Sequence, residues 1–292
     1  MKEINDFIEY LQVIKKDSNY TLDSYEYDLK EYYNVVSKII DINKNDVNKY
    51  LEYLYNKKYN RNTISRKLSA VRSMYKYLVR ENKISVNYFK DVSNPKKEAS
   101  LPKYVDDNDL EKMFKVSDLN SPLGQRNRLI LEMLYATGVR VSELVSIKIS
   151  NINFYDNTIK ILGKGNKERI VIYGSFCEDV LNMYLSSGRK KLLIHGDSDF
   201  LFLNKNGGRL STRSVRNIID DIVFKCSLDY HVSPHTLRHT FATDMLNAGA
   251  DLVSVQELLG HSSLNTTSIY THVSNAQIKK VYDFAHPRAK ER

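Results

Sequence analysis

The stretch from Ser233 to Tyr270 reads SPHTLRHTFATDMLNAGADLVSVQELLGHSSLNTTSIY, and it predicts two short helices with clear ends. Ser233 followed by Pro234 is a typical helix start, because a hydroxyl caps the helix and a proline fits its first position. We expect this helix to run to about Asn247 and to stop at Gly249.

A second helix is expected to begin at Asp251 and to close at Gly260. The unusual polar residues of the stretch lie at the ends of these elements: His235, Arg238, His261 and Tyr270. His235 and Arg238 are three residues apart and share one helix face. Side chains at the ends of short capped helices can point toward a common site without lying in the core.

Composition indicates a soluble protein with a basic surface. The chain has 292 residues, 42% of them hydrophobic, and a formal net charge of +9. This charge favours a polyanion such as nucleic acid as partner, although a merely basic surface is the simpler alternative. Cys177 and Cys226 form no disulfide framework or metal-ligand spacing. The N-terminus is no signal peptide and no apolar run has membrane-spanning length, so we expect a cytoplasmic protein without membrane contact.

Residues 1–91 are expected to form a helical domain. Its helix from Asn62 to Arg80 has an apolar stripe, and the opposite arc carries Arg66, Arg72, Lys76 and Arg80. From Tyr53 to Arg80 there are eight basic residues and no acidic one. A solvated face normally mixes signs, so we interpret this arc as a surface that contacts the phosphate backbone of DNA, with an ordinary surface as the alternative.

Residues 92–105 contain two prolines and no periodicity, which predicts a linker, and residues 106–292 form the second domain. In it, 154–162 and 168–173 alternate like strands around a glycine turn at 163–167, and 200–203 is a further short strand. A final amphipathic helix carries Ile278, Val281 and Phe284. The predicted fold class is therefore mainly α with a small antiparallel β-sheet.

The helix from Arg126 to Tyr135 is apolar on most faces and should be buried. It ends near Gly138, and Arg140 follows at once with Glu143 as its natural orienting partner. The candidate catalytic residues of the chain are Arg140, Lys164, His235, Arg238, His261 and Tyr270.

These residue types suit chemistry on a phosphate. Two arginines can bind its non-bridging oxygens, and a lysine on a glycine turn can donate a proton to a leaving oxygen. Histidines can accept a proton or bind the phosphate at neutral pH, and a tyrosine can be a covalent nucleophile. No metal-ligand spacing and no nucleotide-type glycine loop is present. We therefore expect metal-free phosphoryl transfer through a covalent intermediate, with no cofactor.

As a set, these motifs resemble the tyrosine recombinase (phage integrase) family, most closely the Xer-type site-specific recombinases. The resemblance covers nearly the entire chain. The matching segments are LYATGVRVSEL, GKGNKER, HTLRHTFAT, LGHSSLNTTSIYTHV and HPRA. The family's catalytic positions fall on Arg140, Lys164, His235, Arg238, His261 and Tyr270, with the acidic companion on Glu143.

The resemblance implies a SAM-like helical core-binding domain followed by a catalytic DNA breaking-rejoining domain. It implies that Tyr270 attacks a DNA phosphodiester and forms a 3′-phosphotyrosine, while Lys164 protonates the leaving 5′-oxygen. Arg140 and Arg238 would stabilise the phosphate, His235 would accept the proton of Tyr270, and His261 would hydrogen-bond the phosphate.

The resemblance also implies a homo- or hetero-tetramer on two DNA duplexes, with the C-terminal helix docked onto a neighbouring subunit. The expected role is Xer-type resolution of chromosome or plasmid dimers at cell division. The sequence leaves open whether a sister recombinase or an activating protein takes part.

Three alternatives stay open at this stage. The chain could be the integrase of a phage or conjugative element, although its helices begin near Met1 with no preceding arm-binding domain. It could be a type IB topoisomerase, which uses similar residues without synapsis. It could also bind DNA without catalysis, which the complete set of catalytic residue types disfavours.

Overall fold

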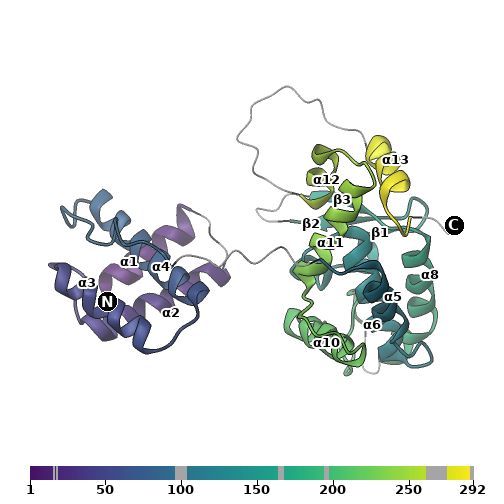
Figure 1. Ribbon diagram of the computed structural model, residues 1–292, viewed down its shortest axis with the longest axis horizontal. Coiled ribbons are helices and arrows are strands. Elements are labelled where there is room, and N and C mark those ends of the chain that lie inside the picture. Colours follow the sequence, from purple (N-terminus) through teal and green to yellow (C-terminus); the bar gives the residue numbers. More distant parts are fainter. Residues whose placement is uncertain are drawn as a thin grey trace. The chain divides into compact units, whose positions relative to one another are not determined.

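The computed structural model describes residues 1–15, 17, 19–95, 104–163, 168–193, 197–260 and 275–289. The chain divides into two compact units, Met1–Ala99 and Ser100–Arg292 (Figure 1). Most described residues are helical, and one small antiparallel sheet lies in the second unit, so the predicted fold class is confirmed. None of the described helices combines the length and apolar character needed to cross a membrane.

The N-terminal unit contains α1 (Lys2–Val13), α2 (Asn19–Val36), α3 (Lys44–Asn56) and α4 (Arg61–Arg80). Side-chain caps set two of the helix starts. Asn43 caps α3 in a reciprocal capping box with Asp46, and Asn60 accepts a hydrogen bond from the backbone of Thr63 in α4.

Buried aromatic rings form the centre of this unit. Tyr32 packs edge-on against Tyr50, Tyr75 and Phe89, with ring centroids 4.9 to 6.1 Å apart. The hydroxyls of Tyr32 and Tyr75 are 2.8 Å apart, and the Tyr75 hydroxyl donates to the backbone oxygen of Ile39. The hydroxyls of Tyr32 and Tyr75 are thus satisfied inside an apolar core, and this contact fixes α2 against α4.

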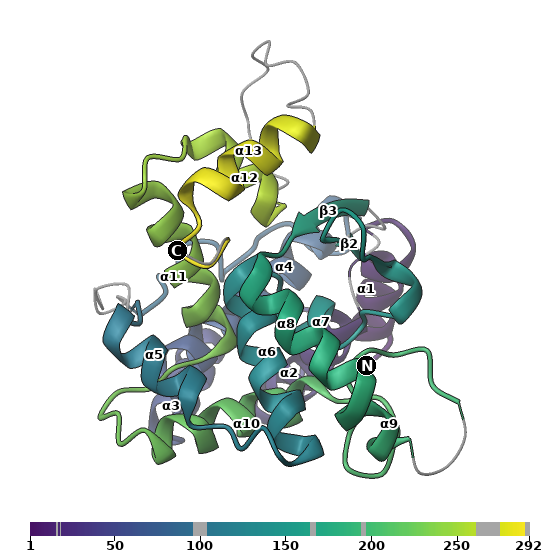
Figure 2. The same cartoon turned by 90° about the vertical axis from the view of Figure 1, so that its right-hand side faces the viewer.

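The helices of the C-terminal unit are α5 (Asp107–Lys115), α6 (Pro122–Thr137), α7 (Val141–Leu144), α8 (Ser175–Met183), α9 (Arg189–Leu192), α10 (Thr212–Lys225), α11 (Pro234–Asn247), α12 (Leu252–Leu259) and α13 (Asn275–Ala285), with short turns η1 (Ile149–Asn151) and η3 (Tyr184–Gly188). Helix α6 runs between α8 and α11 (Figure 2). Every residue from Leu129 to Thr137 is buried, as the apolar sequence of this segment predicts.

The sheet has three antiparallel strands in the order β1 (Ile152–Asn153), β2 (Thr158–Leu162) and β3 (Glu168–Ile172). Strands β2 and β3 were predicted, whereas β1 has only two residues and shows no periodicity. The predicted strand at 200–203 is wrong. Phe200 and Leu203 make only isolated bridges, to Lys148 and Arg209, and neither bridge extends into a ladder.

Helices α11 and α12 form where the sequence predicts them. The Ser233 hydroxyl accepts from the backbone of Thr236, 3.1 Å away, and Pro234 occupies the first turn of α11. Asp251 caps α12, and Gly260 ends it in the left-handed conformation with φ 66°.

Helix α13 packs on its own unit. Ile278 is buried and Val281 packs against the same core, whereas Phe284 is 77% exposed. Ordinary packing within the unit therefore accounts for two of the three apolar residues that were assigned to subunit docking. Only Phe284 is left as a side chain open to another partner.

The residues after α13 are anchored deeply. The His286 ring is buried and stacks on Tyr282 with centroids 4.8 Å apart. Its Nε2 lies 3.3 Å from the backbone oxygen of Tyr135, and its Nδ1 accepts from the backbone nitrogen of Arg288. Arg288 in turn bonds buried Glu132 through two nitrogens. His286 and Arg288 of the HPRA segment thus anchor the residues after α13 to α6.

This arrangement makes the stability of the C-terminal unit sensitive to acid. Burial lowers the pKa of His286 from its ordinary 6.5 to about 3. Below pH 6.5 the unfolded chain takes up a proton that the folded state refuses, so stability present above pH 6.5 is lost as the pH falls toward 3.

We predict that the free energy of unfolding will fall more steeply with acid in the wild type than in His286→Gln, by about 1.4 kcal/mol per pH unit below 6.5. Urea denaturation at pH 7.5, 6.0 and 5.0 measures this difference. The matched control is His231→Gln, because His231 is exposed. Parallel pH profiles for wild type and His286→Gln would contradict the assignment.

Candidate active site

Arg140 lies in the sharp turn between α6 and α7, and Glu143 follows it within the short helix α7. Glu143 accepts hydrogen bonds from the backbone nitrogen of Arg140 at 2.8 Å and from its Nη1 at 3.0 Å. The Glu143 side chain is 5% exposed and that of Arg140 is 41% exposed. The carboxylate thus orients a guanidinium that still faces solvent.

The turn depends on Gly138, which ends α6 in the left-handed conformation with φ 58°. A Cβ at this position would lie 2.7 Å from Phe241 of α11 and 2.8 Å from Leu259 of α12. Only glycine therefore lets α6 end while packed against both helices, and the next turn of chain presents Arg140.

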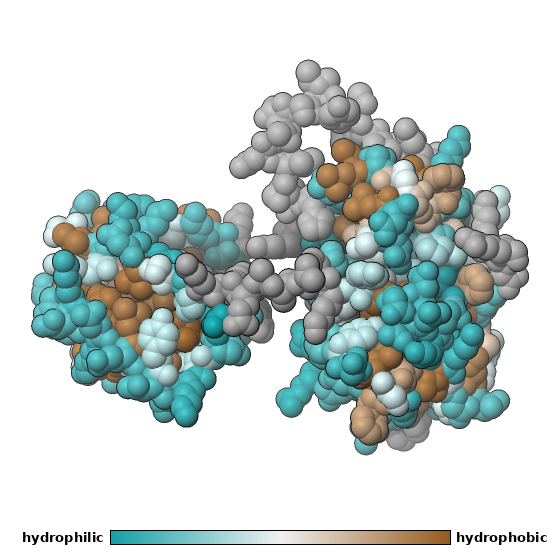
Figure 3. Space-filling view, in the orientation of Figure 1, coloured by the Kyte–Doolittle hydropathy of each residue, from teal (hydrophilic) through white to brown (hydrophobic). Residues whose placement is uncertain are grey.

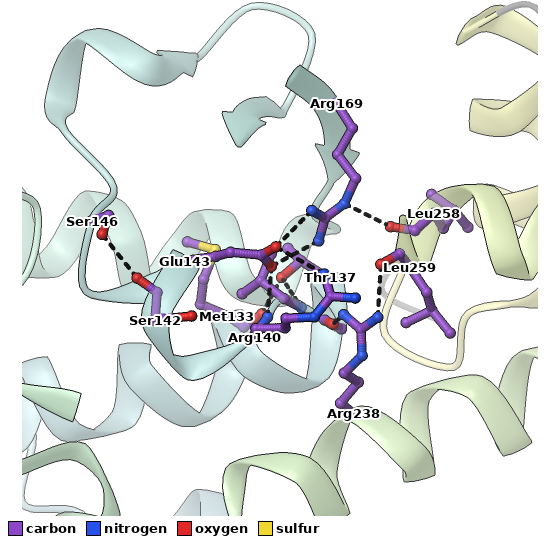
Figure 4. Close-up of polar contacts among 12 residues, drawn as sticks. Met133, Thr137, Arg140, Ser142, Glu143, Ser146, Arg169, Arg238, Leu258 and Leu259 are labelled. Atoms are coloured by element: carbon purple, nitrogen blue, oxygen red, sulfur yellow. Dashed lines mark hydrogen bonds and ion pairs between the residues drawn. The ribbon is translucent and has the colours of Figure 1, made fainter. Parts of the chain in front are cut away.

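Arg238 reaches the same place from α11. It is buried, and its Nη1 donates to the Gly138 oxygen while its Nη2 donates to the Leu259 oxygen at 2.7 Å. One guanidinium thus satisfies the C-terminal carbonyls of α6 and α12, where helix dipoles favour a cation. Figure 4 shows the Arg140 and Arg238 side chains next to each other.

A third arginine, Arg169 of β3, was not among the residues that the sequence singled out. Its Nη1 and Nη2 donate to the two carboxylate oxygens of Glu143, each at 2.9 Å, and its Nε donates to the Leu258 oxygen at 3.2 Å. The only signal in the sequence for a role of Arg169 was its place in the GKGNKER segment. Its contact with Glu143 could not be predicted, because the two residues lie far apart in the chain.

The cluster is strongly positive although it contains a buried carboxylate. Burial alone would raise the pKa of Glu143, but the hydrogen bonds from Arg169 and Arg140 outweigh it and lower the pKa. Burial, together with the charge of Arg140, lowers the pKa of Arg238 to about 10. Three guanidinium groups, those of Arg140, Arg169 and Arg238, thus surround one carboxylate. Such a site attracts a further anion.

Of the other predicted catalytic residues, the structure describes only His235. It lies in the first turn of α11, on the helix that carries Arg238, and its side chain is exposed. Lys164, His261 and Tyr270 lie outside the described residues.

The predicted basic arc of α4 is partly occupied by contacts within its own unit. Arg66 pairs with buried Asp28. Arg72 donates to the backbone oxygen of Val92 at 2.7 Å, and Arg80 pairs with Glu81. The remaining member, Lys76, is exposed and has no hydrogen-bond or ion-pair partner in the part of the chain that the structure describes.

The contact of Arg66 belongs to a buried ion cluster that helical periodicity did not reveal. Lys67 is 1% exposed, and its Nζ lies 2.9 Å from Asp28 and 3.1 Å from Glu31 of α2. One of the eight basic residues counted from the sequence thus holds α2 to α4 and does not face solvent. Contact between α4 and DNA stays a prediction.

Comparison with known proteins places this site in a family. The sequence pattern of the phage integrase family matches residues 103–277, and that of the phage integrase N-terminal SAM-like domain matches residues 4–82. A tyrosine recombinase XerC from Anoxybacillus flavithermus is 45% identical over 98% of this chain and 98% of its own length. One from Bacillus subtilis is 44% identical over 97% of this chain and 95% of its own.

The fold has solved relatives as well. The XerH site-specific recombinase bound to difH substrate in a pre-cleavage complex matches with a TM-score of 0.67 and 25% identity, over 95% of this chain and 82% of that one. The chain therefore belongs to the phage integrase family. Within it, the chain is a tyrosine recombinase of the Xer type, an enzyme that breaks and rejoins DNA, so the predicted resemblance and enzyme class are confirmed.

The turn at Gly138 provides a test of the geometry that does not depend on activity. Gly138→Ala combines an unfavourable backbone conformation with overlap against Phe241 and Leu259, so we expect a loss of about 2 kcal/mol or more in the free energy of unfolding. Urea denaturation measures it.

The matched control is Gly208→Ala, because the nearest atoms to a Cβ there belong to the Asn204 side chain, at 3.2 Å or more. Equal stability of the two variants would show that the end of α6 does not need glycine.

Proposed function

We propose that this enzyme cuts one DNA strand through a 3′-phosphotyrosine and then rejoins the strand to a partner duplex. The observation that carries this proposal is the convergence of Arg140 and Arg238 from separate elements, beside a carboxylate that Arg169 already pairs. Two adjacent guanidinium groups suit the two non-bridging oxygens of one phosphodiester.

The two arginines differ in how they are held. Arg238 is fixed by two backbone carbonyls, which leaves its remaining N–H groups in a set direction. Arg140 is tied at Nη1 only and is 41% exposed, so it can close onto a bound phosphate. We assign both to stabilising the extra negative charge of the transition state.

We assign the nucleophile to Tyr270. At pH 7 its phenolate is roughly 4 kcal/mol above the phenol, since a free tyrosine has a pKa near 10. A cationic cluster and a base close much of this gap, and we assign the base to His235, which is exposed and can accept the phenolic proton.

The attack forms the bond from the Tyr270 oxygen to phosphorus and breaks the bond to the 5′-oxygen. We assign Lys164 as the general acid that protonates this oxygen, and His261 as a hydrogen-bond donor to the phosphate. The reverse reaction with a 5′-hydroxyl from a partner strand restores the diester and frees the tyrosine, so no external energy source is needed.

We assign duplex binding to both domains. Residues 1–91 would contact the phosphate backbone through α4. Of the four basic residues on the predicted arc, Lys76 is exposed and best placed for this contact. Arg66, Arg72 and Arg80 already have hydrogen-bond or ion-pair partners within their own unit. Residues 92–105 would be the linker that lets this domain and the catalytic domain, residues 106–292, close around DNA.

We further propose that the enzyme resolves chromosome or plasmid dimers at cell division, in the cytoplasm where that DNA lies. The support is its similarity along the whole chain to recombinases named XerC, and its fold similarity to XerH bound to difH. Integration or excision of a mobile element is the alternative role for the same chemistry.

Strand exchange between two duplexes requires several active sites, and we propose a tetramer. Apolar surface lies over α12 (Figure 3), where Leu252 is 57% and Val253 41% exposed, and Phe284 of α13 is 77% exposed. We assign these side chains to contacts between subunits. The neighbours would be identical copies or a sister recombinase, with an activating protein as a further partner.

The test is covalent capture of DNA. The protein is incubated with nicked duplex fragments of its host's genomic DNA, denatured, and recovered with any attached DNA for sequencing. We expect the wild type to yield a denaturant-resistant adduct at a defined site and Tyr270→Phe to yield none. Tyr155→Phe is the matched control, because Tyr155 is 95% exposed and has no role in the proposed reaction, and it should behave as wild type. An adduct with Tyr270→Phe would overturn the nucleophile assignment.

A further inference from the structure

We infer that Arg169 is a positioning residue for DNA cleavage, which holds Glu143 and thereby keeps Arg140 available to the phosphate. This inference rests on the function proposed above. The contacts that carry this role are within the protein: the Nε, Nη1 and Nη2 of Arg169 each donate to an acceptor of this chain.

The contact between Arg169 and Glu143 has the geometry of a strong ion pair. Both carboxylate oxygens accept from the guanidinium at 2.9 Å, and the two side chains are 13% and 5% exposed. A two-point, nearly dry contact fixes orientation as well as distance. Since the same carboxylate binds the backbone and side chain of Arg140, the position of Arg140 depends on where Arg169 holds Glu143.

Arg169 also ties this pair to the end of α12. Its Nε donates to the Leu258 oxygen, and the next carbonyl, that of Leu259, accepts from Arg238. Two arginines from different elements therefore hold successive carbonyls of one helix end. This places the Arg140–Glu143 turn and Arg238 in one rigid frame.

Gly260 makes room for this contact. A Cβ at Gly260 would lie 2.8 Å from Cδ and 3.0 Å from Nε of Arg169. The left-handed conformation of Gly260 and the absence of a side chain thus let the arginine stem cross directly over the end of α12.

Charge gives Arg169 a second effect. Without it, the Glu143 carboxylate would be neutralised by Arg140 alone, and that arginine would offer less positive charge to a phosphate. With it, the carboxylate is paired twice and the cluster keeps an excess of cations. The loss of Arg169 should therefore matter most when the bound group is an anion.

The experiment compares two suicide substrates of the captured site, one with a normal scissile phosphodiester and one with a neutral methylphosphonate there. We expect Arg169→Met to slow adduct formation on the phosphodiester by about 100-fold, as expected when a catalytic group is displaced by about 1 Å. On the methylphosphonate the variant should react nearly as fast as wild type, because no anionic charge needs compensation.

Arg169→Lys keeps the charge but not the two-point contact, so it should fall between wild type and Arg169→Met on the phosphodiester. It also decides the outcome if Arg169→Met does not fold, since its ratio of the two rates should shift in the same direction. Arg189→Met is the matched control, because Arg189 also donates to backbone carbonyls, those of Ser198 and Phe200, outside this cluster. It should leave both rates unchanged.

The outcomes separate the inference from the proposed function. Absence of any adduct with wild-type protein overturns the proposed function. An active wild type with Arg169 variants that react equally fast, or that slow equally on both substrates, overturns the positioning role. A selective loss on the charged substrate supports it.

Discussion

The structure of the site depends on one buried carboxylate. Glu143 is almost fully buried and ionised, so it requires cationic partners, and it finds them in Arg140 of its own turn and Arg169 of the sheet. An unpaired charge at this depth would destabilise the fold by several kcal/mol. The need to satisfy Glu143 therefore fixes the sheet against the turn after α6, and the same contacts orient the arginine that we assign to the phosphate.

The ends of two helices supply the rest of the frame. α6 and α12 both stop at glycines in the left-handed conformation, and their terminal carbonyls point toward Arg238 and Arg169. The C-terminal ends of helices carry partial negative charge and unsatisfied acceptors. They therefore hold arginines in place while neutralising only part of the positive charge. The positive charge and the position of Arg238 are thus in place before DNA arrives, while Arg140 stays exposed to receive a phosphate.

Local sequence signals predicted the helices and one ion pair of the site. Capping residues and glycines predicted α11 and α12, and the spacing of three residues predicted the contact between Arg140 and Glu143. The role of Arg169 was not predictable, because its partners Glu143 and Leu258 lie far away in the chain and are brought together only by folding. For the same reason, a helical projection of α4 could not predict that Lys67 is buried against Asp28, because Asp28 belongs to another helix, α2.

In the proposed mechanism, Arg140 and Arg238 bind one and the same phosphate. A crystal structure of the full chain with Tyr270→Phe and uncut duplex DNA containing its site would show whether they do. We expect one phosphate to lie within hydrogen-bond distance of both guanidinium groups while Glu143 still accepts from Arg169. A complex in which the two arginines contact different phosphates, or in which neither reaches the DNA backbone, would contradict it.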